Sequence, residues 1–255
     1  MIFGIEVTRN IKKMSKYILI TASSRGLGFE LAKKLSYSGY NIILTSRSKQ
    51  NLKKAKKQLN NNLKHKIIKI DFTKDNIVKK LLNKISNFNI VSIIHNFGIN
   101  CQDDKHPIDI DILQKIIYNN FIVSVKINNY FYNKLNGDPS KIIYIGSTAS
   151  LHAKASPSYT LSKSLINTYV KNISQEYIKY NILICAILPG ILAHKGSIWD
   201  KKSKKEPQKY NITKTKQPLK RFLIPKDISS YIVDIINQKS LALTGSIVKL
   251  DANDY

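Results

Sequence analysis

The sequence predicts an α/β protein in which a seven-stranded parallel sheet is doubly wound, with helices on both of its faces. Seven short apolar runs rich in β-branched residues alternate with longer amphipathic segments. Uninterrupted apolar strands are typical of parallel sheets buried on both sides, and regular strand–helix alternation indicates right-handed crossovers. The predicted strands are 17–21, 41–45, 66–70, 90–94, 141–145, 181–187 and 246–250. The predicted helices are 26–38, 50–60, 74–86, 109–134, 158–179 and 226–238.

Length and composition favour one globular domain over residues 14–255. The 255 residues suit a single large α/β unit, and the apolar content of 43% suits a folded protein. Residues 1–13 are expected to be an extension outside the fold, with Met14 as an alternative start. The two cysteines lack metal-type spacing and read as reduced thiols of a cytoplasmic protein. No apolar run reaches the length of a membrane span, and no metal site is expected.

The net charge of +26 is the most unusual feature of the composition. Such a charge favours acidic partners, but lysine is abundant along the whole chain, so a solvated lysine surface is preferred over a nucleic-acid face. No zinc-finger spacing or RNA-binding aromatic signature is present, and we expect no specific nucleic-acid partner. Lysines are dense in the lid segment, residues 194–217, which shows little apolar periodicity. A long irregular connection of this kind is often a functional lid, the alternative being a plain surface loop.

A phosphate-binding turn is predicted directly after the first strand. The segment from Thr21 to Gly28 reads Thr-Ala-Ser-Ser-Arg-Gly-Leu-Gly and runs into a helix. Gly26 and Gly28 let the backbone approach a pyrophosphate, and the helix N-terminus offers free N–H groups to it. A glycine pair alone is weak evidence, but the strand before it and the helix after it are the context of a Rossmann-type dinucleotide site.

The residues near the end of the second predicted strand indicate whether the cofactor is NAD(H) or NADP(H). NAD-specific sites place an acidic residue near the end of this strand to bind the ribose 2′-hydroxyl, whereas this chain has Arg47 there and Arg25 in the turn. Two cations suit a 2′-phosphate, so NADP(H) is the predicted cofactor. The alternative is that both arginines are ordinary surface residues of a basic protein.

A second motif carries the predicted chemistry. Tyr159 and Lys163 form a Tyr-x-x-x-Lys pair, which a helix places on one face. Ser147 lies upstream at the end of a predicted strand, with Thr148 as the fallback, and Asn120 lies within the predicted helix 109–134. Together with the turn, these four residues resemble the catalytic tetrad of the short-chain dehydrogenase/reductase family, over about residues 16–252.

The resemblance implies a cofactor site with a defined set of residues. Ala22 departs from the family's first glycine, and Phe97 and His194 replace a usual alanine and threonine. Ala22 is expected either to tighten the turn or to raise the Kd for the cofactor, and Phe97 is expected to crowd the cofactor. Three interpretations of His194 stay open: it replaces the threonine's contact, it faces the substrate, or it is a bystander. The implied cofactor-binding residues are Thr21, Ser23, Ser24, Arg25, Gly26, Leu27, Gly28, Arg47, Asp71, Phe72, Asn96, Phe97, Gly98, Tyr159, Lys163, Pro189, Gly190 and Ile191.

The chemistry that the resemblance implies is hydride transfer between a nicotinamide and a carbonyl or alcohol carbon. Tyr159 would act as general acid or base, with its pKa lowered by Lys163 and an oxidised nicotinamide. Ser147 would hold the substrate oxygen, and Asn120 would hold a water that links Lys163 to solvent. Lys163 would also bind the nicotinamide ribose.

Three interpretations of the substrate and role stay open. The lysine-rich lid suits an anionic partner, and the resemblance slightly favours a 3-oxoacyl chain on an acyl carrier protein over a phosphorylated or nucleotide-linked sugar. A non-catalytic binding protein is the third interpretation. By resemblance the protein is expected to form a homodimer or homotetramer through helices 109–134 and 158–179.

Overall fold

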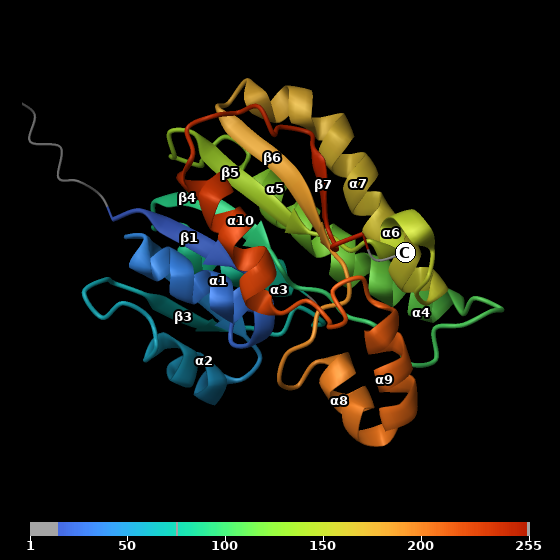
Figure 1. Ribbon diagram of the computed structural model, residues 1–255. Helices are drawn as coiled ribbons and strands as arrows, with labels where there is room; N and C mark the ends of the chain where they lie inside the picture. The colour runs from blue at the N-terminus through green and yellow to red at the C-terminus, as the bar shows by residue number, and fades with distance from the viewer. Residues whose placement is uncertain (1–14, 75, 254–255) are drawn as a thin grey trace, which may run out of the picture.

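The computed structural model describes residues 15–74 and 76–253, so the predicted extension 1–13 and Met14 lie outside the described residues. One sheet of seven parallel strands has the order β3-β2-β1-β4-β5-β6-β7 (Figure 1). The predicted doubly wound Rossmann-type sheet is confirmed. Its strands are β1 (Tyr17–Ile20), β2 (Asn41–Ser46), β3 (Lys66–Lys69), β4 (Ile90–His95), β5 (Ser140–Ile145), β6 (Ile182–Pro189) and β7 (Ile247–Leu250).

Two apolar cores lie on the two faces of the sheet because the strand side chains alternate between them. One core includes Leu81, Ile127 and Val170 from three helices, and the other includes Leu31 and Ile232. Helices α1 and α10 lie side by side in Figure 1. The helices are α1 (Gly26–Tyr37), α2 (Lys49–Lys56), α3 (Ile77–Ile85), α4 (Ile110–Ile117), α5 (Val123–Phe131), α6 (Ala149–His152), α7 (Pro157–Ile178), α8 (Ile198–Lys205), α9 (Pro207–Lys216) and α10 (Pro225–Asn237).

The order of the strands creates the place for a ligand. β1 lies between β2 and β4, so the strand order reverses at β1. Strands β2 and β3 follow on one side of it, and strands β4 to β7 follow on the other. Open parallel sheets bind ligands outside the carboxyl ends of the strands at such a switch point. The residues after β1, β2 and β4 therefore lie at the edge of the sheet where such a crevice is expected.

The predicted helix 109–134 is not continuous. A π-helical turn, Tyr118–Ile122, separates α4 from α5 and carries Asn120 at its middle. The Asn120 side chain donates to Ile99 O (3.0 Å) and accepts from Ile99 N (2.7 Å), so it binds the backbone that follows β4. Single π turns inside helices are frequent at functional sites.

The lid segment is helical, so the expectation of an irregular connection was wrong. Ser197 caps α8 by accepting from Asp200 N (3.1 Å), and Pro207 begins α9. The rings of Trp199 and Tyr210 pack on Phe222, with centroid distances of 4.6 and 5.2 Å. The apolar partner of the two helices thus lies beyond the segment, and for this reason its own periodicity did not reveal them.

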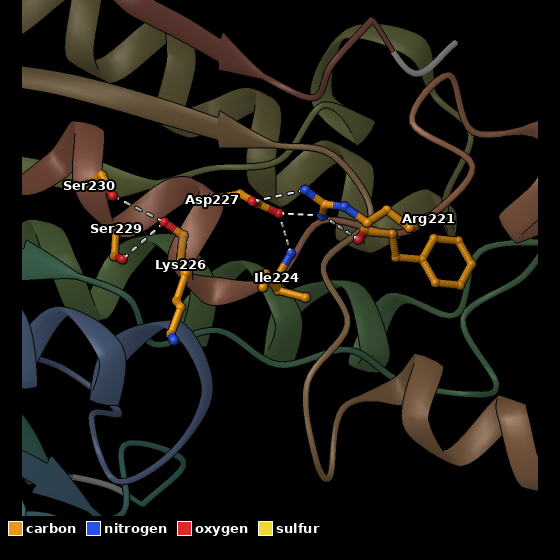
Figure 2. A network of polar contacts seen from close by, with 7 residues as sticks. Arg221, Ile224, Lys226, Asp227, Ser229 and Ser230 are labelled. Atoms are coloured by element: carbon orange, nitrogen blue, oxygen red, sulfur yellow. Dashed lines mark hydrogen bonds and ion pairs between the residues drawn. The ribbon is translucent and has the colours of Figure 1, made fainter.

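Both ends of the lid are fixed to the body of the domain. Leu192 and Leu223 form a parallel bridge, and Arg221 donates to both carboxylate oxygens of Asp227, at 2.6 and 3.1 Å, near the start of α10 (Figure 2). Asp227 also accepts from Ile224 N, and Lys226 O accepts from the hydroxyls of two serines, as Figure 2 shows.

No helix among the described residues is long and apolar enough to cross a membrane.

Candidate active site

The phosphate turn after β1 has the backbone shape that its motif predicts. Ala22 has φ 53° and Gly26 has φ 59°, so both lie in the left-handed region that favours glycine. A Cβ atom on Gly28 would lie 2.8 Å from Ala22 O and 2.5 Å from the Asn96 amide nitrogen. The alanine at position 22 therefore keeps the turn at some cost in backbone strain, and position 28 has no room for a side chain.

Several residues predicted to contact the cofactor brace this turn. Thr21 Oγ1 accepts from the backbone N–H groups of Asn96 and Phe97, at 2.9 Å each. Asn96 Nδ2 donates to the carbonyls of Thr21 and Ala22 (3.1 Å each), which joins the ends of β1 and β4. Ser23 is fully buried and accepts from Thr45 N (3.0 Å). The side chains of Thr21, Ser23 and Asn96 thus hold the turn in shape.

The residues predicted at the adenosine end gather after β2 and β3. Arg25 and Arg47 are both exposed. Asp71 accepts from Thr73, whose hydrogen bonds, together with the charge of Arg47, outweigh partial burial and lower the pKa of the Asp71 carboxyl. Arg47 is therefore close enough to Asp71 for their charges to interact.

Phe72 and Phe97 pack against each other, with ring centroids 4.9 Å apart. Phe72 is buried, so the position after β3 contributes its ring to the core. Phe97 is half-buried and rests on that ring. Part of the Phe97 ring is thus buried against Phe72, which explains how a bulky residue fits where the family uses alanine.

Two of the four predicted catalytic residues, Asn120 and Lys163, lie beside Gly98. A Cβ atom on Gly98 would lie 3.5 Å from both Asn120 Oδ1 and Lys163 Nζ. Lys163 Nζ donates to Ile145 O (2.9 Å) and lies 5.7 Å from the centre of the Tyr159 ring. Tyr159 and Lys163 project from one face of α7 toward the end of β5, where Ser147 follows the strand.

Burial sets the direction of both pKa shifts in this group. Burial raises the pKa of the Tyr159 phenol, while its hydrogen bond with Ser147 acts in the opposite direction. Burial also lowers the pKa of Lys163 to about 8. Lys163 Nζ donates to a strand carbonyl instead of the phenol, and the lowering of the Tyr159 pKa by Lys163 together with an oxidised nicotinamide stays a prediction. At pH 7 the phenol therefore carries its proton and most Lys163 side chains are charged.

The choice between Ser147 and Thr148 follows from their contacts. Thr148 is buried and its hydroxyl donates to Pro189 O (3.4 Å), whereas Ser147 bonds Tyr159. A Cβ atom on Gly146 would lie 2.2 Å from Leu188 Cδ2. A serine at position 146 would thus have to displace the end of the Leu188 side chain on β6, which runs through Pro189, two residues beyond the predicted strand end.

The turn fits a dinucleotide. Gly26 and Gly28 keep its backbone free of side chains, and the N-terminus of α1, which begins at Gly26, offers its N–H groups to a phosphate there. A short-chain dehydrogenase family model matches residues 16–206, three quarters of the chain. This protein is a short-chain dehydrogenase/reductase. Members of this family are oxidoreductases that act on carbonyl or alcohol groups.

Two curated relatives and one solved structure are similar to this protein over nearly its whole length. The protein is 28% identical to the 3-oxoacyl-acyl-carrier-protein reductase FabG of Buchnera aphidicola subsp. Baizongia pistaciae, over 96% of this chain and 99% of the relative. It is 22% identical to FabG of Aquifex aeolicus, over 96% and 99%. L-sorbose reductase of Gluconobacter frateurii, solved with NADPH and L-sorbose, superposes with a TM-score of 0.85 at 20% identity, over 94% of this chain and 97% of that one.

One residue of this dehydrogenase's site escaped the sequence analysis. Asp104, on the loop after β4, accepts from the backbone N–H groups of Ser158 and Tyr159, at 3.0 Å each. Hydrogen bonds from Ser156, Ser158 and Tyr159 outweigh burial and lower the pKa of its carboxyl. Asp104 thus fixes the first turn of α7 and with it the backbone of Tyr159. It lies 54 residues before Ser158, so no local pattern could have indicated the contact.

Proposed function

We propose that the protein is an NADPH-dependent reductase that converts a 3-oxoacyl chain, carried on an acidic carrier, to the 3-hydroxyacyl form. The observation that supports it most is that Asn120 and Lys163 lie beside Gly98, and that Lys163 Nζ lies 5.7 Å from the centre of the Tyr159 ring. A carbonyl placed beside Ser147 and Tyr159 would meet both a hydrogen-bond donor and an acid. NADPH supplies the hydride when it is bound.

The protein's own part in the reaction is to orient the carbonyl and deliver one proton. Ser147 Oγ donates to the carbonyl oxygen and holds it at the phenol. Tyr159 gives its proton to that oxygen as negative charge develops on it, and its raised pKa suits the acid role. Lys163 stays near by as a cation that stabilises the resulting phenolate, and Asn120 holds the water through which the proton is replaced.

Specificity for the 2′-phosphate is assigned to Arg25 and Arg47. Both guanidinium groups are exposed at the crevice, and Arg47 is near enough to Asp71 to lower the carboxyl pKa. A charge-assisted hydrogen bond to phosphate contributes about 1.5–3 kcal/mol. Replacing either arginine with glutamine should raise the Kd for NADPH by about 10- to 100-fold.

The Kd for NADH provides the internal control, because this dinucleotide lacks the 2′-phosphate. Fluorescence titration of both dinucleotides should show the NADH value changing by less than about threefold in Arg25→Gln and Arg47→Gln. Equal losses for the two dinucleotides would show that the arginines act on the whole cofactor, and the specificity assignment would fail.

The substrate proposal depends on the charge of the lid. Eight lysines lie in or beside α8 and α9: Lys195, Lys201, Lys202, Lys204, Lys205, Lys209, Lys214 and Lys216. Such a surface attracts an acidic carrier protein and accelerates its association. The two FabG relatives are named for reduction of a 3-oxoacyl group on such a carrier, which supports the same substrate class here.

A steady-state assay separates the candidate substrates. NADPH oxidation should be fast with a 3-oxoacyl carrier protein, slower with the same acyl group on a small thioester, and the difference should shrink as salt is raised. A phosphorylated ketose is the second candidate, since the lysine-rich lid suits its charge equally. Turnover of the ketose alone would reverse the ranking, and NADPH binding without turnover of any carbonyl would favour a binding protein.

The assembly proposed is a cytoplasmic homodimer or homotetramer. Exposed apolar side chains on α4 and α7, among them Ile110 (60% exposed), Leu161 (45%) and Leu165 (37%), support an interface on these helices. Isolated exposed apolar residues are ordinary, but several on adjacent helices indicate a contact surface.

Among the described residues, no group of histidine, cysteine or acidic side chains is arranged to hold a metal.

A further inference from the structure

The first residues of the lid rest directly on the phosphate turn. A Cβ atom on Gly26 would lie 2.5 Å from His194 Nε2 and 2.7 Å from His194 Cε1, so the imidazole occupies the space that this glycine leaves open. A Cβ atom on Gly196 would likewise lie 3.0 Å from Arg25 Nη1. Two left-handed glycines, one on each side, allow the lid and the turn to come this close.

The imidazole is held in a defined orientation. His194 Nδ1 lies 3.0 Å from Lys195 O, and because a carbonyl only accepts, Nδ1 carries the hydrogen in this contact. His194 N donates to Ser197 Oγ, and Gly196 N donates to Asp200 Oδ2 (2.8 Å), which orders the turn that begins α8. The second ring nitrogen, Nε2, is therefore the one directed at Gly26, where a pyrophosphate approaches the backbone.

We propose that His194 is a ligand of the cofactor's pyrophosphate and that dinucleotide binding takes up a proton at its Nε2. This inference rests on the proposed dinucleotide site. With Nδ1–H committed to Lys195 O, a neutral ring presents only a lone pair to the phosphate, which would be repelled. A proton from solvent on Nε2 gives an N–H that donates to a phosphate oxygen and a charge that is attracted to it.

The charges around the ring set the direction of the effect. Arg25 on the turn and Lys195 beside the ring are cationic, whereas Asp200 binds Gly196 N from α8. The pyrophosphate is attracted to both cations and, in addition, to a protonated ring, so dinucleotide affinity should increase as the pH is lowered.

The test is the Kd for dinucleotides between about pH 6 and pH 8.5, measured by fluorescence titration of the full chain. NADH is the main probe, because its pyrophosphate stays ionised over this range, whereas the 2′-phosphate of NADPH titrates near pH 6. The wild-type Kd for NADH should rise about tenfold across the range, as expected for loss of a charge-assisted hydrogen bond. His194→Ala should bind about tenfold more weakly at pH 6 and show almost no dependence on pH.

Two further variants make the result specific. His194→Thr should also lose the pH dependence. Lys195→Gln removes a neighbouring cation and leaves the imidazole in place, so it should keep a Kd for NADH that rises with pH. Tighter binding by His194→Ala at all pH values would overturn the proposal, because the ring would then be an obstacle. An unchanged pH dependence in that variant would overturn it as well. A wild-type protein that binds neither dinucleotide would refute the proposed function itself.

Discussion

Replacing Tyr159 with phenylalanine is expected to lower the turnover number for carbonyl reduction by about 10²–10⁴-fold, the contribution of a well-placed general acid. The ring remains and packs as before, but the phenolic proton that Tyr159 would give to the substrate oxygen is gone. Single-turnover oxidation of bound NADPH measures the loss directly, without the complication of product release. The Kd for NADPH should stay within about threefold of wild type, because only one hydroxyl is removed.

Tyr169→Phe is the matched control for this substitution. Tyr169 lies on the same helix, α7, but its ring packs on Phe121 and Tyr144 in the core. The Tyr169→Phe protein should turn over at nearly the wild-type rate. Retention of more than about a tenth of the wild-type rate by Tyr159→Phe would contradict the proposed acid.

The wild-type rate of carbonyl reduction should decline as the pH rises through about 8, the pKa to which burial lowers Lys163, because the cation that stabilises the phenolate is then lost.

Acid is expected to destabilise the fold through His95. The ring lies at the end of β4, is buried, and bonds the Asn128 side chain (2.7 Å), which in turn donates to Tyr144 OH (2.8 Å). Burial lowers the pKa of His95 from 6.5 to about 4. The folded state therefore keeps the ring neutral, while the unfolded chain binds a proton as the pH falls below about 6.5.

The sign and size of this effect follow from linkage. The contribution of His95 is fully present above pH 6.5 and is lost as the pH falls toward 4. The loss reaches about 3 kcal/mol in total, at up to about 1.4 kcal/mol per pH unit. Burial also lowers the pKa of His65, aided by the charge of Lys56, so part of the acid slope belongs to that residue. Urea unfolding at a series of pH values measures the sum.

Substitution assigns the share of each histidine. His95→Gln should be less stable than wild type at pH 7, since it disturbs a packed network, but its free energy of unfolding should fall less steeply between pH 6.5 and 4. His106→Gln removes an exposed ring and should keep the wild-type slope. A His95 variant with an unchanged slope would show that the acid sensitivity arises elsewhere.

Most of the fold could be predicted because its signals are local. The strands are continuous runs of β-branched residues, and their bounds lie within about two residues of those expected. The phosphate turn was recognisable because Gly26 stands between a strand and a helix. Ala22 was recognised as a departure, and its left-handed φ shows why glycine is favoured there.

The features that the sequence did not reveal depend on contacts between distant segments. α8 and α9 pack their rings on Phe222, outside the segment that was judged irregular. The Leu188 side chain of β6 packs close to Gly146, and Asp104 reaches α7 from a loop. The π turn at Asn120 arises where its amide bonds the backbone after β4. None of these contacts leaves a periodic pattern.

The decisive experiment for the proposed reaction is a crystal structure of the complex with NADP⁺ and a 3-hydroxyacyl product analogue. The nicotinamide ring should lie beside Gly98, with the analogue's hydroxyl within hydrogen-bonding distance of both Tyr159 Oη and Ser147 Oγ. A dinucleotide bound elsewhere, or a hydroxyl out of reach of the phenol, would contradict it.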